Sequence, residues 1–233
     1  MSIKAYRILK KVDIVVGYKT YIELVEELIS ENTVVHSSGM KQEMERANKA
    51  IDFAHKGKKV AIISSGDPGV YGMAGLVLEI INKENFKLEF EVIPGITAAN
   101  AAAAGLGAPL MHDYCVISLS DLLTPWSIIK KRLQQAARGD LIVVLYNPKS
   151  KKRVRPLKEA QKILLKNKNF DTPVGIVKNA KRGKERTQIT TLENMLDKEI
   201  DMLTTVIIGN ESTYISETVN KTRLMITPRG YNL

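Results

Sequence analysis

Short apolar runs recur along the chain and alternate with segments of helical spacing. The apolar runs are typical of β-strands and occupy residues 14–16, 33–35, 60–63, 88–93, 116–119, 141–146, 174–177 and 205–208. Segments 21–29, 44–54 and 128–136 instead repeat apolar residues every three or four positions, which predicts helices. Strands that alternate with helices indicate an α/β fold.

Several of these strands are apolar at every position rather than at alternate positions. Strands covered by helices on both faces show this pattern, which favours a largely parallel sheet in the first half of the chain. Clear helical spacing becomes rare after Lys168, so we expect a mixed sheet in the second half. A Gly-Leu-Gly helix end at residues 105–107 and the following Pro109 punctuate the chain. We therefore expect two α/β domains, residues 1–110 and 111–233.

Two glycine-rich turns directly follow predicted strands. The first has the sequence SSGDPGVYG at residues 64–72, and the second has PGITAAN at residues 94–100. Glycine and proline turns of this kind expose backbone amides and leave room for a ligand to touch the backbone. Because the carboxyl ends of parallel strands meet at one edge of a sheet, we expect both turns to form one ligand site there.

The composition is that of a globular protein, with 44% hydrophobic and 26% charged residues in 233. Apolar windows of the roughly 18 residues that a membrane helix needs do not occur, and the first residues do not resemble a signal peptide. These features predict a cytoplasmic protein that does not bind a membrane. The single cysteine, Cys115, lies in an apolar strand pattern and is expected to be a buried, unreactive thiol.

The net charge of +10 suggests an acidic partner, because 35 Lys and Arg face only 25 Asp and Glu. Much of the excess lies in segments 149–155 and 178–186, which both follow predicted strands. Two interpretations remain open. These segments meet a polyanionic substrate or RNA, or they are ordinary solvated faces of a lysine-rich protein.

Motifs at residues 64–72, 94–104, 145–148 and 177–180 occur in the order and spacing of the tetrapyrrole (corrin/porphyrin) methylase superfamily, which nearly the whole chain resembles. Within it, VGYKTY at 16–21, SSGM at 37–40 with Glu43 and Arg46, and LSDLLTPW at 119–126 are similar to the precorrin-3B C17-methyltransferase, or cobalt-factor III methyltransferase, branch of cobalamin biosynthesis. This combination is more specific than either glycine turn alone.

The resemblance implies two α/β domains with S-adenosylmethionine in the cleft between them, and a homodimer. It also implies methylation at C17 of a polycarboxylate tetrapyrrole with ring contraction, and leaves open whether that substrate carries cobalt. Carried over by motif, the cofactor contacts would be Ser65, Gly66, Asp67, Val70, Tyr71, Thr97, Ala98, Tyr146, Asn147, Asn179, Ala180, Thr191 and Leu192.

These residue types suit methyl transfer. A methyl sulfonium needs orientation and a water-poor site more than it needs a base, and backbone groups with small side chains provide both. Asp67 either contacts the cofactor or bonds the amides of its own turn. Tyr71 and Tyr146 are equally compatible with ordinary core packing.

Ring contraction requires proton movement, so general acid or base assistance is expected. Asp121 is the first candidate because it lies in a polar turn directly after an apolar strand, and His36 and Glu43 are the second. Asp121 has an alternative role as a cap of the helix that starts near Pro125. We expect no protein-bound metal, because the spacing of the histidines does not match that of metal ligands.

The basic residues have a natural use against a substrate with many carboxylates. Arg46 is the best candidate, since its forked donor group suits a carboxylate, and Lys149 and Lys178 are further candidates. For both lysines a solvated surface position is the alternative.

Members of the superfamily normally begin with an apolar strand and a Gly-x-Gly-Pro-Gly-Asp loop. Residues 2–16 already resemble the helix and strand that follow that loop, so we expect a truncated or misassigned start, and the activity of this chain is left open. Two other functions compete: an enzyme of the same fold with another acceptor (a different corrin position, diphthine synthase or ribosomal RNA methylase), and a non-catalytic basic RNA-binding protein. Segments 18–21 and 120–126 argue against the first. Segment 149–155 has no aromatic residue to stack on bases, so no nucleic-acid partner is expected.

Overall fold

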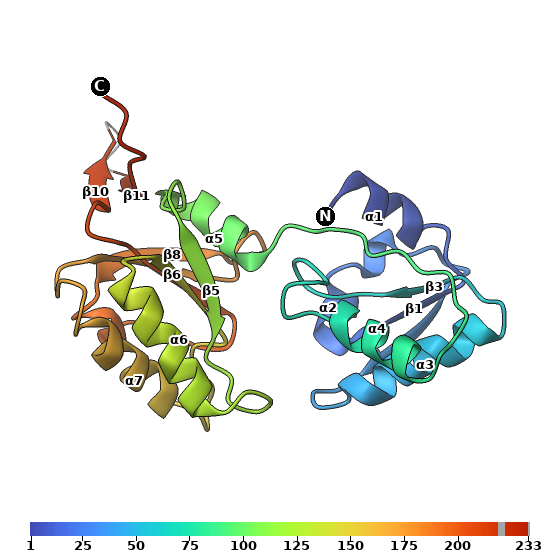
Figure 1. Cartoon of the computed structure of the whole chain (residues 1–233). Helices are drawn as coiled ribbons and strands as arrows, with labels where there is room; N and C mark the ends of the chain where they lie inside the picture. Colours follow the sequence, from blue (N-terminus) through green and yellow to red (C-terminus); the bar gives the residue numbers. More distant parts are fainter. Residues whose placement is uncertain (219–221, 233) are drawn as a thin grey trace. The chain divides into compact units, whose positions relative to one another are not determined.

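The computed structural model describes residues 1–218 and 222–232, and the chain divides into two compact units, Met1–Thr97 and Ala98–Leu233 (Figure 1). Each unit has its own sheet and its own apolar core. Strands and helices alternate along most of the chain, which confirms the α/β class.

The first unit is built on a three-stranded parallel sheet in the order β2-β1-β3, which confirms the expected parallel arrangement. Its elements are α1 (Ile3–Leu9), β1 (Ile14–Tyr18), α2 (Lys19–Glu23), the 3-10 turn η1 (Glu26–Leu28), β2 (Val34–Ser38), α3 (Glu43–His55), β3 (Val60–Ile62) and α4 (Ala74–Lys83). Val15 of β1 packs with Leu9 of α1. Its neighbours Ile14 and Val16 pack with Ala50 of α3 on the opposite face, so both faces of β1 are covered.

Two expectations for the first unit are wrong. Residues 88–93 join no ladder of the described residues, and Phe90 and Val92 are exposed. An apolar, β-prone run becomes a strand only where a neighbouring strand supplies ladder hydrogen bonds, and here the described part of the chain supplies none. The helix expected over residues 21–29 is shorter, because α2 ends at Glu23 and only η1 follows.

The second unit holds a five-stranded sheet in the order β5-β6-β9-β7-β8. Its strands are β5 (Tyr114–Ser118), β6 (Ile142–Tyr146), β7 (Pro173–Lys178), β8 (Arg186–Thr191) and β9 (Thr204–Ile208). The pair β5 and β6 is parallel and the other neighbouring pairs are antiparallel, which confirms the expected mixed sheet. The remaining elements are α5 (Ala98–Leu106), α6 (Trp126–Arg138), α7 (Arg155–Leu164), η2 (Met195–Asp197) and a small sheet of β4 (Gly107–Ala108), β10 (Tyr214–Glu217) and β11 (Arg223–Ile226).

Alternate residues of β6 serve two separate cores. Val143 and Leu145 pack in the core that contains α6 and α7, which lie side by side on one face of the sheet (Figure 1). Ile142 and Val144 pack in the core that contains α5. The uninterrupted apolar run over residues 141–146 is therefore explained by burial on both faces.

Helix α5 belongs to the second unit, whereas the sequence places it in the first domain. It packs so closely on β7 that a Cβ at Gly175 would collide with the side chain of Leu106. This contact explains why the division falls after Thr97 and not after residue 110. Such packing between residues far apart in the chain leaves no local signal.

The sequence analysis missed β4, β8, β10 and β11. Strand β8 has the polar sequence RTQITT and lies at the edge of its sheet, with its first residues exposed. An edge strand needs apolar residues only where it touches the core, so the apolar pattern that reveals a central strand is weak here.

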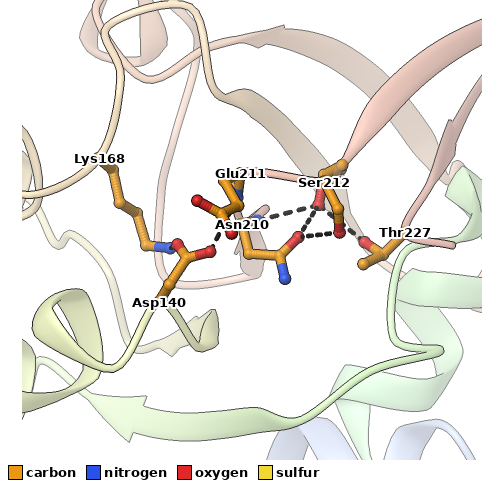
Figure 2. Close-up of polar contacts among 7 residues, drawn as sticks. Asp140, Lys168, Asn210, Glu211, Ser212 and Thr227 are labelled. Atoms are coloured by element: carbon orange, nitrogen blue, oxygen red, sulfur yellow. Dashed lines mark hydrogen bonds and ion pairs between the residues drawn. The ribbon is translucent and has the colours of Figure 1, made fainter. Parts of the chain in front are cut away.

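A buried ion pair anchors the edge of the second sheet from which β6 and β7 begin (Figure 2). Lys168 Nζ lies 2.7 Å from Asp140 Oδ1, and the Lys168 side chain is 1% exposed while that of Asp140 is 34% exposed. The second oxygen of Asp140 accepts a hydrogen bond from the Glu211 amide at 3.0 Å. Asp140 therefore connects the segment before β7 with the turn after β9.

Hydrogen bonds between residues of that turn also stabilise it (Figure 2). Asn210 Oδ1 accepts hydrogen bonds from the hydroxyls of Ser212 and Thr213, each at 2.9 Å. Thr213 Oγ1 lies 2.8 Å from Thr227 Oγ1, which lies 2.9 Å from the carbonyl oxygen of Pro109. The small sheet is thus tied to the end of β9 by buried polar groups that all have partners.

We expect Asp140→Ala to lower the free energy of unfolding by about 3–5 kcal/mol, because it leaves a buried ammonium group without its counter-ion. Lys168→Met should cost less, since Asp140 is partly exposed and keeps the Glu211 amide. Denaturant unfolding followed by circular dichroism measures both. Lys4→Met removes the exposed Lys4–Glu91 pair and serves as the control, with an expected change below about 1 kcal/mol. Equal costs for Asp140→Ala and the control would contradict this role of the buried pair.

Candidate functional site

The two glycine-rich turns of the first unit come together beyond the end of β3. Asp67 joins them: its Oδ1 accepts a hydrogen bond from the Gly69 amide at 2.8 Å, and its Oδ2 accepts one from the Gly95 amide at 2.9 Å. Gly95 lies so close to the first turn that a Cβ there would collide with the Gly66 carbonyl oxygen. Asp67 therefore has the turn-forming role that the sequence left open, and the two turns form one backbone-lined surface.

The other predicted cofactor contacts of this unit lie in the same two turns: Ser65, Val70, Tyr71 and Thr97. Ser64 Oγ accepts a hydrogen bond from the Met73 amide at 3.0 Å and so closes the first turn. Tyr71 is 59% exposed, which excludes the alternative of core packing. Its φ of 54° is unusual for a non-glycine residue.

The Arg46 guanidinium group makes its contacts inside the first unit. Arg46 is 5% exposed, its Nε donates to Ser38 Oγ at 2.8 Å, and Nη2 donates to the Gly39 carbonyl at 2.9 Å. The group also lies 5.9 Å from the centre of the Tyr18 ring. Arg46 therefore ties the ends of β1 and β2 together, and a substrate carboxylate would have to compete with these bonds.

The two second-tier acid or base candidates also lie in the first unit. His36 of β2 is half-buried, and its ring lies 4.7 Å from the Phe53 ring between centroids. Glu43 is the exposed first residue of α3. Their catalytic roles remain predictions.

In the second unit, β5, β6 and β7 run in the same direction and end at one edge of the sheet. This edge carries most of the predicted site residues of the unit: Asp121, Tyr146, Asn147, Lys149, Lys178, Asn179 and Ala180. Asn147 and Asn179 have φ values of 49° and 54°, a conformation that asparagine adopts more readily than most residues. Asn147 Nδ2 donates to Ser118 Oγ at 3.0 Å, so the ends of β5 and β6 are joined.

Tyr146 connects this edge to α5. Its hydroxyl accepts a hydrogen bond from the Ala99 amide at 2.7 Å, in the first turn of the helix where Ala98 also lies. The ring packs against the core on the α5 face of the sheet. Tyr146 is therefore partly a core residue, and its hydroxyl lies at a helix amino terminus.

Asp121 does not cap α6. The N-cap residue is Pro125, and no side-chain cap hydrogen bond occurs there. Asp121 is exposed, and its Oδ1 lies 3.8 Å from Arg153 Nη1. Its carboxylate is therefore accessible beside a cation, which leaves the acid or base role as the remaining prediction.

Arg153 contacts several loops at this edge, although the sequence analysis counted it only within the basic segment 149–155. Nη1 donates to the Leu119 carbonyl at 3.2 Å and Nη2 donates to the Asn147 carbonyl at 2.9 Å. No local signal separates Arg153 from its basic neighbours, because one acceptor, the Leu119 carbonyl, lies 34 residues away in another loop.

Lys178 forms ion pairs with Glu199 at 2.6 Å and with Asp201 at 2.7 Å. Hydrogen bonds to Asp201 and Glu199 raise the pKa of Lys178. The bond from Lys178 lowers the pKa of Glu199. Burial would raise the pKa of Asp201, but bonds from Lys178, Leu203 and Thr204 outweigh it and hold that pKa low. Most of the Lys178 charge is thus already balanced, which weakens its case as a receptor for substrate carboxylates.

Thr191 and Leu192 do not join the other predicted cofactor contacts of the second unit. Strand β8 runs antiparallel to β7, and Thr191 pairs with Pro173 at the start of β7, whereas Asn179 follows its end. Leu192 is completely buried and bonds to Thr172 through its backbone. The sequence analysis did not recognise β8 as a strand, so it gave no direction for these two residues, and their cofactor role remains a prediction.

Cys115 is half-buried, and burial raises the pKa of its thiol, as expected of an unreactive cysteine. In residues 1–218 and 222–232, no group of three or more His, Cys, Asp and Glu is arranged to hold a metal ion. The same residues contain no helix that is both long enough and apolar enough to span a membrane.

Glycine-rich turns at the strand ends of an α/β protein are typical of an enzyme that binds a small-molecule cofactor. The model of the family Tetrapyrrole (Corrin/Porphyrin) Methylases matches residues 1–196, and the chain belongs to that family.

Named relatives agree with this membership. The chain is 51% identical over 98% of its length to the cobalt-factor III methyltransferase of Priestia megaterium, but it spans only 42% of that relative. It is 49% identical over its full length to the probable cobalt-factor III C(17)-methyltransferase of Salmonella typhimurium, of which it spans 94%.

Solved structures show the same fold. The crystal structure of the methyltransferase CobJ has a TM-score of 0.89 at 33% identity and matches 98% of this chain and 93% of its own. The uroporphyrin-III C-methyl transferase from Thermus thermophilus, complexed with S-adenyl homocysteine, has a TM-score of 0.68 at 24% identity, with 90% of each chain covered, and shows the fold alone.

The ion-pair cluster at Lys178 predicts how stability depends on pH. The lowered pKa values of Glu199 and Asp201 mean that their contribution is present above their unfolded-state values of about 4 and is lost as pH falls through the folded-state values. The raised pKa of Lys178 means that its contribution is present below about pH 10 and is lost as pH rises through its folded-state value.

Thermal unfolding as a function of pH tests the cluster. We expect the melting temperature of Lys178→Met to fall less steeply below about pH 4 than that of the unaltered protein, because the two carboxylates lose the partner that lowers their pKa values. Lys184→Met, at an exposed residue of the following loop, is the control and should keep the original slope. Identical slopes for all three proteins would contradict the cluster's contribution.

Proposed function

We propose that this protein transfers a methyl group from S-adenosylmethionine to C17 of cobalt-factor III or precorrin-3B, with ring contraction, in cobalamin biosynthesis. The observation that carries the proposal is the identity of 49–51% over nearly the whole chain to proteins named as cobalt-factor III methyltransferases. A precorrin-3B C(17)-methyltransferase of Sinorhizobium sp is also 39% identical over 92% of the chain. The Salmonella typhimurium and Sinorhizobium relatives are both named for C(17), one with cobalt-factor III and one with precorrin-3B, so the proposal leaves the metal content of the substrate to experiment.

The residues fit S-adenosylmethionine as the cofactor. The two glycine turns lie so close together that Gly95 leaves no space for a Cβ beside the Gly66 carbonyl, so a ligand at this surface would meet backbone. We assign Ser65, Gly66, Val70, Tyr71, Thr97 and Ala98 to the cofactor, together with Tyr146, Asn147, Asn179 and Ala180. When bound, the cofactor supplies an electrophilic methyl group, and the task of these residues is to hold it and to exclude water.

For the substrate, we propose that Lys149 meets a carboxylate directly. It lies half-buried in the loop after β6, next to Asn147. Arg46 and Lys178 act less directly, because both already bond to protein groups. Arg46 orders a strand end and adds positive charge to its loop, which favours a polyanionic substrate, whereas Lys178 orders its strand end but has its charge balanced by Glu199 and Asp201.

Asp121 is our candidate for moving the proton that ring contraction requires. Its carboxylate is exposed at the edge that also carries Asn147, and Arg153 lies beside it.

We further propose that the protein works as a homodimer in the cytoplasm. Sedimentation analysis of the purified protein tests whether it is a homodimer.

The cofactor assignment is tested by titrating the protein with S-adenosylhomocysteine in a calorimeter. We expect binding in the range of about 1 μM to 1 mM. Gly95→Ala should weaken it at least about tenfold, because the new methyl group collides with the Gly66 carbonyl and separates the turns. Gly75→Ala is the matched control, since a Cβ there meets no atom within 4 Å. Unchanged affinity in Gly95→Ala, with the protein folded, would remove the turns from the cofactor site.

The role of Asp121 is tested by Asp121→Asn, which keeps the shape of the side chain and removes its basicity. We expect S-adenosylhomocysteine affinity to remain unchanged and turnover of cobalt-factor III to fall by about 10²–10⁴-fold. Single-turnover assays measure the methylation and ring-contraction steps separately. Unchanged turnover would exclude Asp121 as the proton-transfer group.

A further inference from the structure

Arg153 lies in the loop between β6 and α7, and its guanidinium group reaches backbone groups of two different loops. Nη1 donates to the carbonyl of Leu119, in the loop after β5, at 3.2 Å. Nη2 donates to the carbonyl of Asn147, directly after β6, at 2.9 Å. A third segment is touched as well, because Met202 Sδ, shortly before β9, lies 3.6 Å from Nη2.

These contacts join segments that carry proposed site residues. Asn147 is a proposed cofactor contact, and its φ of 49° makes it a position that surrounding contacts must hold. Asp121, the proposed proton-transfer group, lies two residues beyond Leu119, and its Oδ1 is 3.8 Å from Nη1. One side chain therefore bonds to both loops and lies beside the Asp121 carboxylate.

The loop after β5 depends on such a contact because apolar packing fixes its outer part only weakly. Leu122 is 72% exposed and Leu123 is 98% exposed. The loop is attached near its base, where the Leu119 amide donates to the Tyr146 carbonyl at 2.9 Å. The Arg153 guanidinium group adds a hydrogen bond to the Leu119 carbonyl and an ion pair with Asp121, two residues closer to the start of α6 at Trp126.

The choice of arginine follows from its geometry. A guanidinium group is a rigid fork with donors that point in different directions, whereas an ammonium group is a compact point charge. Carbonyl oxygens of two separate loops and a carboxylate are satisfied together only by the fork. The Arg153 side chain is 15% exposed, so these bonds form largely out of water, where each is worth more.

We propose that Arg153 is a positioning residue of the methyl-transfer site. It fixes the relative positions of the loops after β5 and β6, so that Asn147 and Asp121 are in place for the reaction. The inference rests on the proposed function, because that function gives Asn147 and Asp121 their roles. The part that concerns the loops themselves is testable without any ligand.

The experiment compares Arg153→Gln and Arg153→Lys with Arg132→Gln, which removes one positive charge from an exposed position in the middle of α6. Hydrogen exchange of the ligand-free proteins is measured first. We expect amides of residues 119–124 and 147–153 to exchange faster in both Arg153 variants, and amides of β6 to remain protected. Arg132→Gln should match the unaltered protein.

The same proteins are then assayed with S-adenosylhomocysteine and with cobalt-factor III, at a temperature where circular dichroism shows each to be folded. We expect Arg153→Gln to lower kcat/KM by about 10²-fold, since a displacement of about 1 Å has that effect on a positioned group. Arg153→Lys should recover only part of this loss, because it restores the charge but not the fork. A fall in melting temperature without these changes would indicate a merely structural role and would overturn the proposal.

The two proposals fail in different ways. Absence of S-adenosylhomocysteine binding in the unaltered protein would contradict the proposed function, while the exchange data would still decide whether Arg153 holds the loops. Normal binding and turnover in the unaltered protein and in Arg153→Gln alike would leave the function intact and overturn the positioning role. Unchanged exchange in residues 119–124 and 147–153 would overturn it regardless of activity.

Discussion

Hydrogen bonds from side chains to loop backbone hold together the strand ends on which the site depends. Loops have no ladder of their own, so their amides and carbonyls need other partners. In the first unit, Asp67 accepts from the amides of two turns, and Arg46 donates to the loop after β2. In the second unit, Arg153 donates to the carbonyls of two loops. Each unit thus uses charged side chains, directed at neutral backbone groups, to order the loops that a ligand would meet.

The cores beneath these loops supply rigid supports. Central strands with two apolar faces, such as β1 and β6, are held by helices on both sides, and their ends are correspondingly well placed. Gly175 shows how tight this packing is, because the Leu106 side chain occupies the space where its side chain would be. At the opposite edge of the second sheet, the Lys168–Asp140 pair and the Asn210 turn fasten the remaining connections. Side-chain contacts thus stabilise that edge, whereas the other edge carries the proposed site residues Asn147 and Asp121.

The basic residues of this protein have different roles, which the net charge of +10 does not distinguish. Arg46 and Arg153 are largely buried and act on backbone. Lys178 is balanced by two carboxylates, whereas Lys149 lies in a loop beside the proposed cofactor contacts. Sequence counts treated all of these residues alike, because the surroundings that distinguish them are contributed by distant parts of the chain.

The sequence by itself determined the α/β class, most of the central strands, the glycine turns and the family. These rest on local patterns: apolar runs, helical spacing and motifs whose residues are neighbours in the chain. Only the tertiary structure decided that residues 88–93 form no strand, that α5 belongs to the second unit, and that Thr191 and Leu192 lie far from Asn179. It also decided that Asp67 joins two turns and that Arg153 joins its own loop to the loop after β5. In each of these cases the partner is remote in sequence, and strand pairing, packing and hydrogen bonds between remote residues leave no periodic trace in the chain.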